Sequence, residues 1–134
     1  GTGYFYTANG SYPHSGTGYI YLGVNNSVSG QAYQSVTIPS TANGTLTFWL
    51  NVTSSETTTT TQYDKLFVEV RNSSGTLLST LATYSNLNKA SAGVYTQRSL
   101  NVAAYKGQTV RIQFRATTDS SLATTFRIDD AVLY

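Results

Sequence analysis

The feature that most constrains the fold of this chain is a strict alternation of apolar and polar residues in short runs. In the run 45–53, Leu46, Phe48 and Leu50 fall on one side and Trp49 on the other, because successive side chains of a strand point to opposite faces. No stretch of the sequence shows the 3.6-residue period of an amphipathic helix. The alternation predicts an all-β protein whose antiparallel sheets have one face in a core and one in water.

Turn-forming residues divide the chain into eight such runs. Gly44, Gly75 and Gly107 each follow a polar residue and supply the positive φ that tight turns need. The predicted strands cover residues 18–23, 31–38, 45–53, 63–71, 76–82, 94–102, 108–117 and 125–133. Strands of this number and spacing predict a two-sheet antiparallel β-sandwich. A jelly roll would place strands 1-8-3-6 in one sheet and 2-7-4-5 in the other.

The length of 134 residues predicts one domain. We expect a single β-sandwich module over residues 1–134, with an irregular, glycine-rich N-terminal segment at 1–16 and the sandwich at 17–134. The threonine-rich stretch 54–62 reads as a long surface connection. Because the sequence has no Met, we expect it to be a piece of a longer polypeptide.

Composition excludes several kinds of partner. Charged residues make up 10% of the chain and the formal net charge is +2, which is too small to predict binding to nucleic acid or an anionic membrane. No apolar stretch approaches the roughly 20 residues that span a bilayer. The polar residues are mostly uncharged ones (Ser, Thr, Asn, Gln and Tyr), as is common in extracellular β modules, so we expect a secreted protein. The absence of Cys fits a bacterial one.

Catalytic residues are not predicted. His14 is the one histidine and lies in a glycine-rich segment, without the buried carboxylate that a triad needs. A glycosidase needs two carboxyl groups across a cleft, but Asp129 and Asp130 are adjacent and would point to opposite faces of a strand. The sequence therefore predicts a protein that is not an enzyme.

Calcium is the expected ion, because the available donors are oxygens. In the jelly-roll order, the loops after strands 3 and 7 lie at one end, which would gather Glu56, Asp64 and Asp119. Asp130 falls on the core-facing parity of the last strand, where a buried carboxylate needs a partner. The alternative is that Asp130 accepts hydrogen bonds from backbone amides and that Glu56 and Asp119 are ordinary loop acids.

Outward-facing aromatic and polar residues predict a binding surface on the first sheet. Flat rings stack on the C–H faces of sugars, and polar side chains pair with their hydroxyls. The residues that share this predicted face are Trp49, Tyr19, Tyr21, Tyr95, Gln97, Asn51, Arg127 and Asp129. The same parity turns Arg98 inward, which predicts a β-bulge in strand 94–102.

The outer face of the second sheet offers a rival groove. Its predicted outward residues are Tyr63, Lys65, Phe67, Glu69, Arg71, Arg111, Gln113 and Arg115. They could line a polar groove or form cross-strand ion pairs on a solvated face. Tyrosines on either face could equally be sheet-packing residues.

The chain resembles a known family from His14 onward, and most clearly in its closing quarter. The stretch 99–133, with its segments 104–110 (AYKGQTV), 118–121 (TDSS) and 128–130 (IDD), is similar to jelly-roll accessory domains of secreted bacterial proteases and glycoside hydrolases. These resemble MAM-type and immune-inhibitor-A-type sandwiches. The resemblance implies a secreted accessory module joined to a parent hydrolase in one polypeptide. In similar modules an aspartate of the last strand binds a structural calcium, which makes Asp130 the first metal candidate.

Together these features predict a non-catalytic carbohydrate-binding module. Its low charge favours a neutral polysaccharide, for which a plant β-1,4-glucan such as cellulose or xyloglucan is the preferred ligand. The alternative is a calcium-stabilised structural or protein-interaction domain of a secreted protease, with no sugar site.

Overall fold

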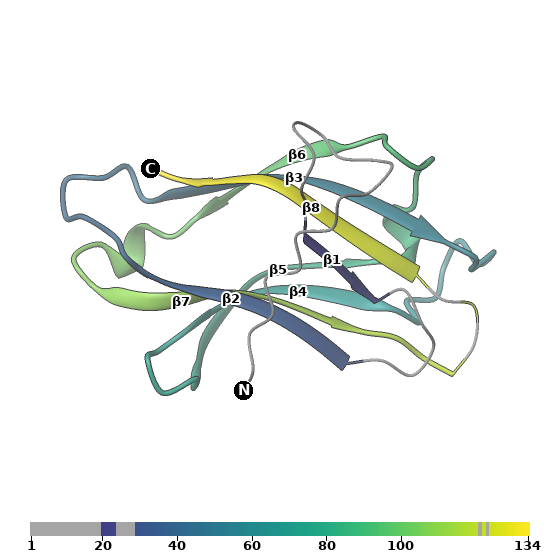
Figure 1. Ribbon diagram of the computed structural model, residues 1–134, viewed down its shortest axis with the longest axis horizontal. Coiled ribbons are helices and arrows are strands. Elements are labelled where there is room, and N and C mark those ends of the chain that lie inside the picture. Colours follow the sequence, from purple (N-terminus) through teal and green to yellow (C-terminus); the bar gives the residue numbers. More distant parts are fainter. Residues whose placement is uncertain (1–19, 24–28, 121, 123) are drawn as a thin grey trace.

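The computed structural model describes residues 20–23, 29–120, 122 and 124–134, which form eight strands in two antiparallel sheets packed face to face (Figure 1). One sheet has the order β1-β8-β3-β6 and the other β2-β7-β4-β5, so the predicted β-sandwich and its jelly-roll order are confirmed. The strands are β1 (Ile20–Gly23), β2 (Ser29–Thr37), β3 (Thr45–Ser54), β4 (Lys65–Arg71), β5 (Leu77–Ser85), β6 (Thr96–Asn101), β7 (Thr109–Thr117) and β8 (Thr124–Leu133).

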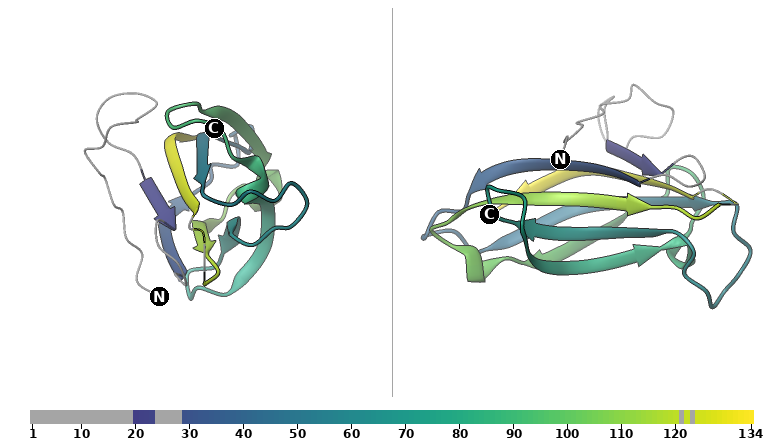
Figure 2. Two further views of the ribbon diagram at one scale, coloured as in Figure 1. Left: turned by 90° about the vertical axis from the view of Figure 1, so that its right-hand side faces the viewer. Right: turned by 90° about the horizontal axis from the view of Figure 1, so that it is seen from below.

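Two short 3-10 turns interrupt the connections. They are η1 (Asn86–Asn88), after β5, and η2 (Ala103–Tyr105), before β7. Figure 2 shows the sandwich from its end and from below, with the strands running along its long axis. Within the described residues, no helix is long and apolar enough to cross a membrane.

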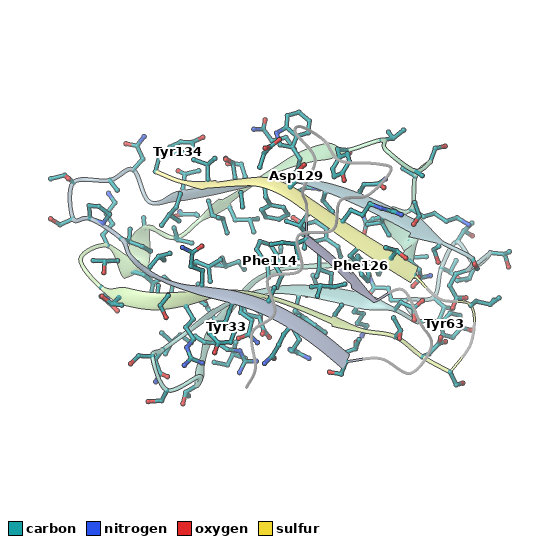
Figure 3. The ribbon with its side chains drawn as sticks, in the orientation of Figure 1. Tyr33, Tyr63, Phe114, Phe126, Asp129 and Tyr134 are labelled. Atoms are coloured by element: carbon teal, nitrogen blue, oxygen red, sulfur yellow. The ribbon has the colours of Figure 1, made fainter. Side chains whose placement is uncertain are left out.

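The core lies between the two sheets and is built from the apolar side of each alternating run. Phe48 of β3, Phe114 of β7 and Phe126 of β8 are buried there, and Figure 3 shows Phe114 and Phe126 between the layers. The rings of Phe48 and Phe114 meet edge to face, with centroids 5.3 Å apart, an arrangement that aromatic pairs favour. Phenylalanines of both sheets therefore join the two layers.

The predicted turn glycines have the backbone conformation expected of them. Gly44, Gly75 and Gly107 all have positive φ. At Gly44 the chain also passes close to η2, where a Cβ would lie 2.6 Å from the Cα of Ala103. Any other residue would be strained and would clash there.

A β-bulge in β8 overturns the predicted parity of its end. The register of β8 with β3 shifts between Thr47 and Trp49, so β8 has one extra residue there. Asp130 lies in this irregular stretch with φ of +49° and is exposed. The prediction of a core-facing Asp130 is therefore wrong, and beyond the bulge Leu133 is partly buried while Val132 is exposed.

The bulge expected in strand 94–102 is absent from the described strand β6, whose register with β3 is continuous. Arg98 does point inward from this edge strand, opposite Phe48. Its guanidinium carbon lies 4.9 Å from the centre of the Tyr84 ring. A cation–π contact at the rim of the core explains how an inward arginine is accommodated without a bulge.

Candidate functional site

Three predicted binding residues form one row across the outer face of the β1-β8-β3-β6 sheet. Trp49 on β3 pairs with Gln97 on β6 and with Asp129 on β8. Gln97 is exposed, and Trp49 and Asp129 are partly exposed. Figure 3 shows Asp129 on the side of its sheet away from the core. We call this surface, formed by Trp49, Gln97 and Asp129, the Trp49 face.

Asn51 was expected on the same surface but is buried, with 1% of its area exposed. Its amide donates hydrogen bonds to the carbonyls of Ser91 (3.0 Å) and Val94 (2.8 Å) and accepts one from the amide of Gly93 (3.3 Å). The prediction that Asn51 faces a ligand is therefore corrected: it anchors the loop between β5 and β6. That loop leads directly into Tyr95, which is partly buried and precedes β6.

Arg127 lies opposite Asn51 on β8 and is largely engaged with its own sheet. Its guanidinium donates to the hydroxyl of Thr53 at 3.0 Å and approaches the Asn51 side-chain oxygen at 3.4 Å. The backbone of Tyr21 pairs with Arg127 on the other side. Tyr19 and the side chain of Tyr21 lie outside the described residues.

The opposite sheet carries an ion-pair network. Glu69 is fully buried. Its two carboxylate oxygens form ion pairs with the guanidinium nitrogens of Arg71, at 2.9 Å, and Arg115, at 3.0 Å. The guanidinium of Arg115 also lies 4.3 Å from the centre of the Phe67 ring. We call Glu69, Arg71 and Arg115 the Glu69 cluster. Its charges and one ring face are occupied within the protein.

The same face contains a second aromatic contact that our sequence analysis missed. Arg111 lies over the ring of Tyr33 at 4.4 Å, and Gln113, which is buried, bonds to Gln31 at 3.1 Å. The signal was available, because Ala32 faces the core and the alternation of β2 sends its neighbours outward. Figure 3 shows Tyr33 on the outer side of this sheet.

The third site lies at the end of the sandwich where the β3–β4 and β7–β8 connections meet, at the right of Figure 1. Glu56, Asp64 and Asp119 each bring one carboxylate oxygen into a group whose members all lie within 4.8 Å of one another. We call these three residues the Glu56 cluster. Their convergence was expected from the jelly-roll order, whereas Asp130, the fourth predicted metal residue, is exposed on β8 and does not belong to the group.

Asp64 is fixed in place by hydrogen bonds. One carboxylate oxygen accepts the backbone N–H of Asp119 at 2.8 Å, and the other accepts the hydroxyl of Thr124. The buried side-chain oxygen of Asn86 accepts the backbone amides of Tyr63 and Asp64. Sequence reasoning missed Asn86, since nothing in the chain's local pattern marks a residue of η1 as the support of a distant loop.

Glu56 is the least satisfied member of the cluster. Its side chain is 3% exposed, and its Oε1 is buried without a hydrogen-bond partner among the described residues. Burial raises the pKa of Glu56, the carboxylates of Asp119 and Asp64 raise it further, and Lys89 opposes them. The Lys89 ammonium donates to the backbone carbonyl of Glu56.

Comparison with known proteins agrees with this architecture. No protein-family model matches the chain, and no curated protein matches its sequence. Among solved structures, it is similar to the family 30 carbohydrate-binding module of a cellulosomal cellulase of Clostridium thermocellum, with a TM-score of 0.52 and 11% identity. The match covers 89% of this chain and 75% of that chain. At this identity the likeness concerns the fold alone: the chain has a β-sandwich fold like that of a carbohydrate-binding module.

Proposed function

We propose that this chain is a non-catalytic carbohydrate-binding module that holds a neutral polysaccharide on the Trp49 face. The observation that carries the proposal is the cross-strand row in which a partly exposed Trp49 has Gln97 and Asp129 on either side. Neighbouring strands lie about 4.8 Å apart, which is close to the width of a pyranose ring. A sugar stacked on the indole would therefore place its hydroxyls near an amide and a carboxylate.

Charge supports a neutral ligand. The net charge of the whole chain is +2, and the arginines of the Glu69 cluster are already paired with a carboxylate. Little positive charge is left there to attract an anionic glycan. A plant β-1,4-glucan such as cellulose or xyloglucan is the ligand class we propose, and the similar module from a cellulase supports that choice.

Three buried carboxylates, half of the six acidic residues of the chain, support a non-catalytic role. A glycosidase presents its two carboxyl groups to the substrate from either side of a cleft. Glu56, Asp64 and Glu69 are 3%, 0% and 0% exposed, so none of them can contact a sugar in this conformation. We further propose that the module is secreted as part of a bacterial hydrolase and acts by keeping that parent enzyme at its polymer.

Affinity gel electrophoresis and pull-down with a panel of polysaccharides test the proposal. We expect retention by xyloglucan or cellulose, and an affinity loss of about tenfold, ~1.4 kcal/mol, for Trp49→Ala. Phe67→Ala is the matched control, since it removes an aromatic ring from the opposite face, and it should bind normally.

Two results would count against this assignment. If Phe67→Ala abolished binding and Trp49→Ala did not, the glycan would lie on the opposite sheet. If no polysaccharide were retained at all, the alternative of a structural or protein-interaction domain of a secreted protease would be favoured.

A further inference from the structure

We propose that the Glu56 cluster binds one calcium ion, which ties the two loops at that end of the sandwich together. The site is separate from the Trp49 face, so it goes beyond sugar binding. Glu56 and Asp64 come from the connection between β3 and β4, and Asp119 comes from the connection between β7 and β8. Both connections cross from one sheet to the other. An ion held by both would therefore fasten the two layers at this end.

The spacing of the cluster fits a calcium shell. Calcium holds its oxygen ligands at 2.3–2.6 Å, so two ligands of one ion are at most about 5 Å apart. One carboxylate oxygen from each of Glu56, Asp64 and Asp119 satisfies that limit, because all three lie within 4.8 Å of one another. A single ion can thus contact all three without a large movement of the backbone.

The second observation is the unsatisfied oxygen of Glu56. Glu56 is 3% exposed, and its Oε1 is buried without a hydrogen-bond partner among the described residues. A buried charged oxygen without a partner is costly, and native proteins usually pair such a group or give it to a metal. The carboxylate belongs to the cluster, so a cation bound there would supply the missing partner.

The chemistry of the donors selects calcium. The cluster offers carboxylate oxygens, with no nitrogen or sulfur among its three residues, which disfavours zinc and copper. Magnesium needs near-ideal octahedral geometry and gives up its water reluctantly, whereas calcium accepts irregular shells of six to eight oxygens. Loop carbonyls and water would complete such a shell.

Lys89 is the rival for this role. Its ammonium donates a hydrogen bond to the backbone carbonyl of Glu56, and leaves Oε1 of the side chain without a partner among the described residues. Lys89 brings one positive charge to a group of three carboxylates. Lys89 thus compensates the cluster in part, and a divalent ion would complete the compensation.

The site is also largely formed before any ion arrives. Asp64 is oriented by the Asp119 amide and the Thr124 hydroxyl, and Asn86 holds the backbone on which Asp64 lies. Prior fixing of ligands reduces the ordering cost of binding. Calcium should therefore raise stability by linkage, because it binds the folded chain and not the unfolded one.

Thermal unfolding of the full chain, stripped with a chelator and dialysed, tests the proposal. Extracellular calcium sites have dissociation constants of about 0.1–1 mM, so calcium at about 10 mM nearly saturates them. We expect the melting temperature to rise by roughly 5–10 °C. Magnesium at the same concentration should produce less than about half of that rise.

Variants locate the ion. Glu56→Gln and Asp119→Asn preserve side-chain volume, and both should lose most of the calcium-induced rise. Asp130→Asn is the matched control, because Asp130 is an exposed acid outside the cluster, and it should respond like the parent chain. Circular dichroism of each variant before heating confirms that it is folded.

Three outcomes would overturn the proposal. The first is an unchanged melting temperature with calcium, which would mean that Lys89 suffices. The second is a full calcium response in Glu56→Gln, and the third is loss of the response in Asp130→Asn. Calorimetric titration with calcium chloride should give about one ion per chain, and it does not depend on the variants.

Discussion

Two buried glutamates of this chain are treated in opposite ways. Glu69 is 0% exposed and lies between the guanidinium groups of Arg71 and Arg115, at 2.9 and 3.0 Å. Glu56 is 3% exposed, lies against two other carboxylates, and has an oxygen without a hydrogen-bond partner among the described residues. The first carboxylate is matched within the protein, whereas the second is the one to which we assign a calcium ion.

The difference shows how buried polar groups can be sorted into structural and functional ones. A buried charge that is paired with opposite charges is part of the folded structure. Removing one partner leaves the remaining charge buried and unpaired, which lowers the free energy of unfolding. A buried charge that the fold leaves unmatched is a candidate ligand-binding group. The same sorting assigns Asn51 to the structure, since its amide is used by the loop after β5.

The largest effect is expected at Glu69. Glu69→Gln keeps the volume but removes the charge that both arginines share, so we expect a loss of about 3 kcal/mol in the free energy of unfolding. Urea denaturation monitored by circular dichroism measures it. A loss below about 1 kcal/mol would show that Arg71 and Arg115, which are partly exposed, reach water instead, and it would weaken the contrast with Glu56.

A smaller effect is expected at Asn51, which extends the comparison to an uncharged side chain. Asn51→Ala would leave the carbonyls of Ser91 and Val94 and the amide of Gly93 without this partner. We expect a loss of about 2 kcal/mol in the same denaturation assay. Unchanged stability would mean that water replaces the side chain and that the loop is not anchored through it.

The smallest effect is the pH dependence of the metal-free chain. The pKa of Glu56 is raised above its ordinary value of 4.5, so the folded state binds this proton more tightly than the unfolded state does. Stability from this group is present below that ordinary value and is lost as pH rises through the raised pKa. Asp64, Asp119 and Lys89 face Glu56 and shape its titration.

Glu56→Gln isolates that contribution. As the pH rises from about 4 to neutral, the melting temperature of the calcium-free parent chain should fall relative to that of Glu56→Gln. The difference should be about one degree. With calcium the order should reverse, because the parent chain then gains a bound ion. Parallel curves for the two proteins would show that Glu56 is already balanced, like Glu69.

The sandwich and its strand order could be predicted from sequence because their causes are local or highly constrained. Alternation in runs such as 45–53 fixes which side of each strand faces the core. The jelly-roll order then determines which loops meet, and this was enough to bring Glu56, Asp64 and Asp119 together.

The errors have causes that the pattern does not contain. One extra residue in β8 reverses the parity of its end, which exposed Asp130 instead of burying it. Asn51 was on the expected side of β3, but a loop from elsewhere in the chain covers it. Arg98 kept the predicted inward direction through a contact with Tyr84 that no spacing rule anticipates.

The most direct test of the proposed sugar site uses Trp49 as its own reporter. Trp49 is the one tryptophan of the chain, so its fluorescence reports on the Trp49 face alone. Titration with a soluble xyloglucan oligosaccharide should change the emission in a saturable way, with a midpoint equal to the dissociation constant from calorimetry. Binding seen by calorimetry with unchanged emission, or no binding by either method, would contradict the account.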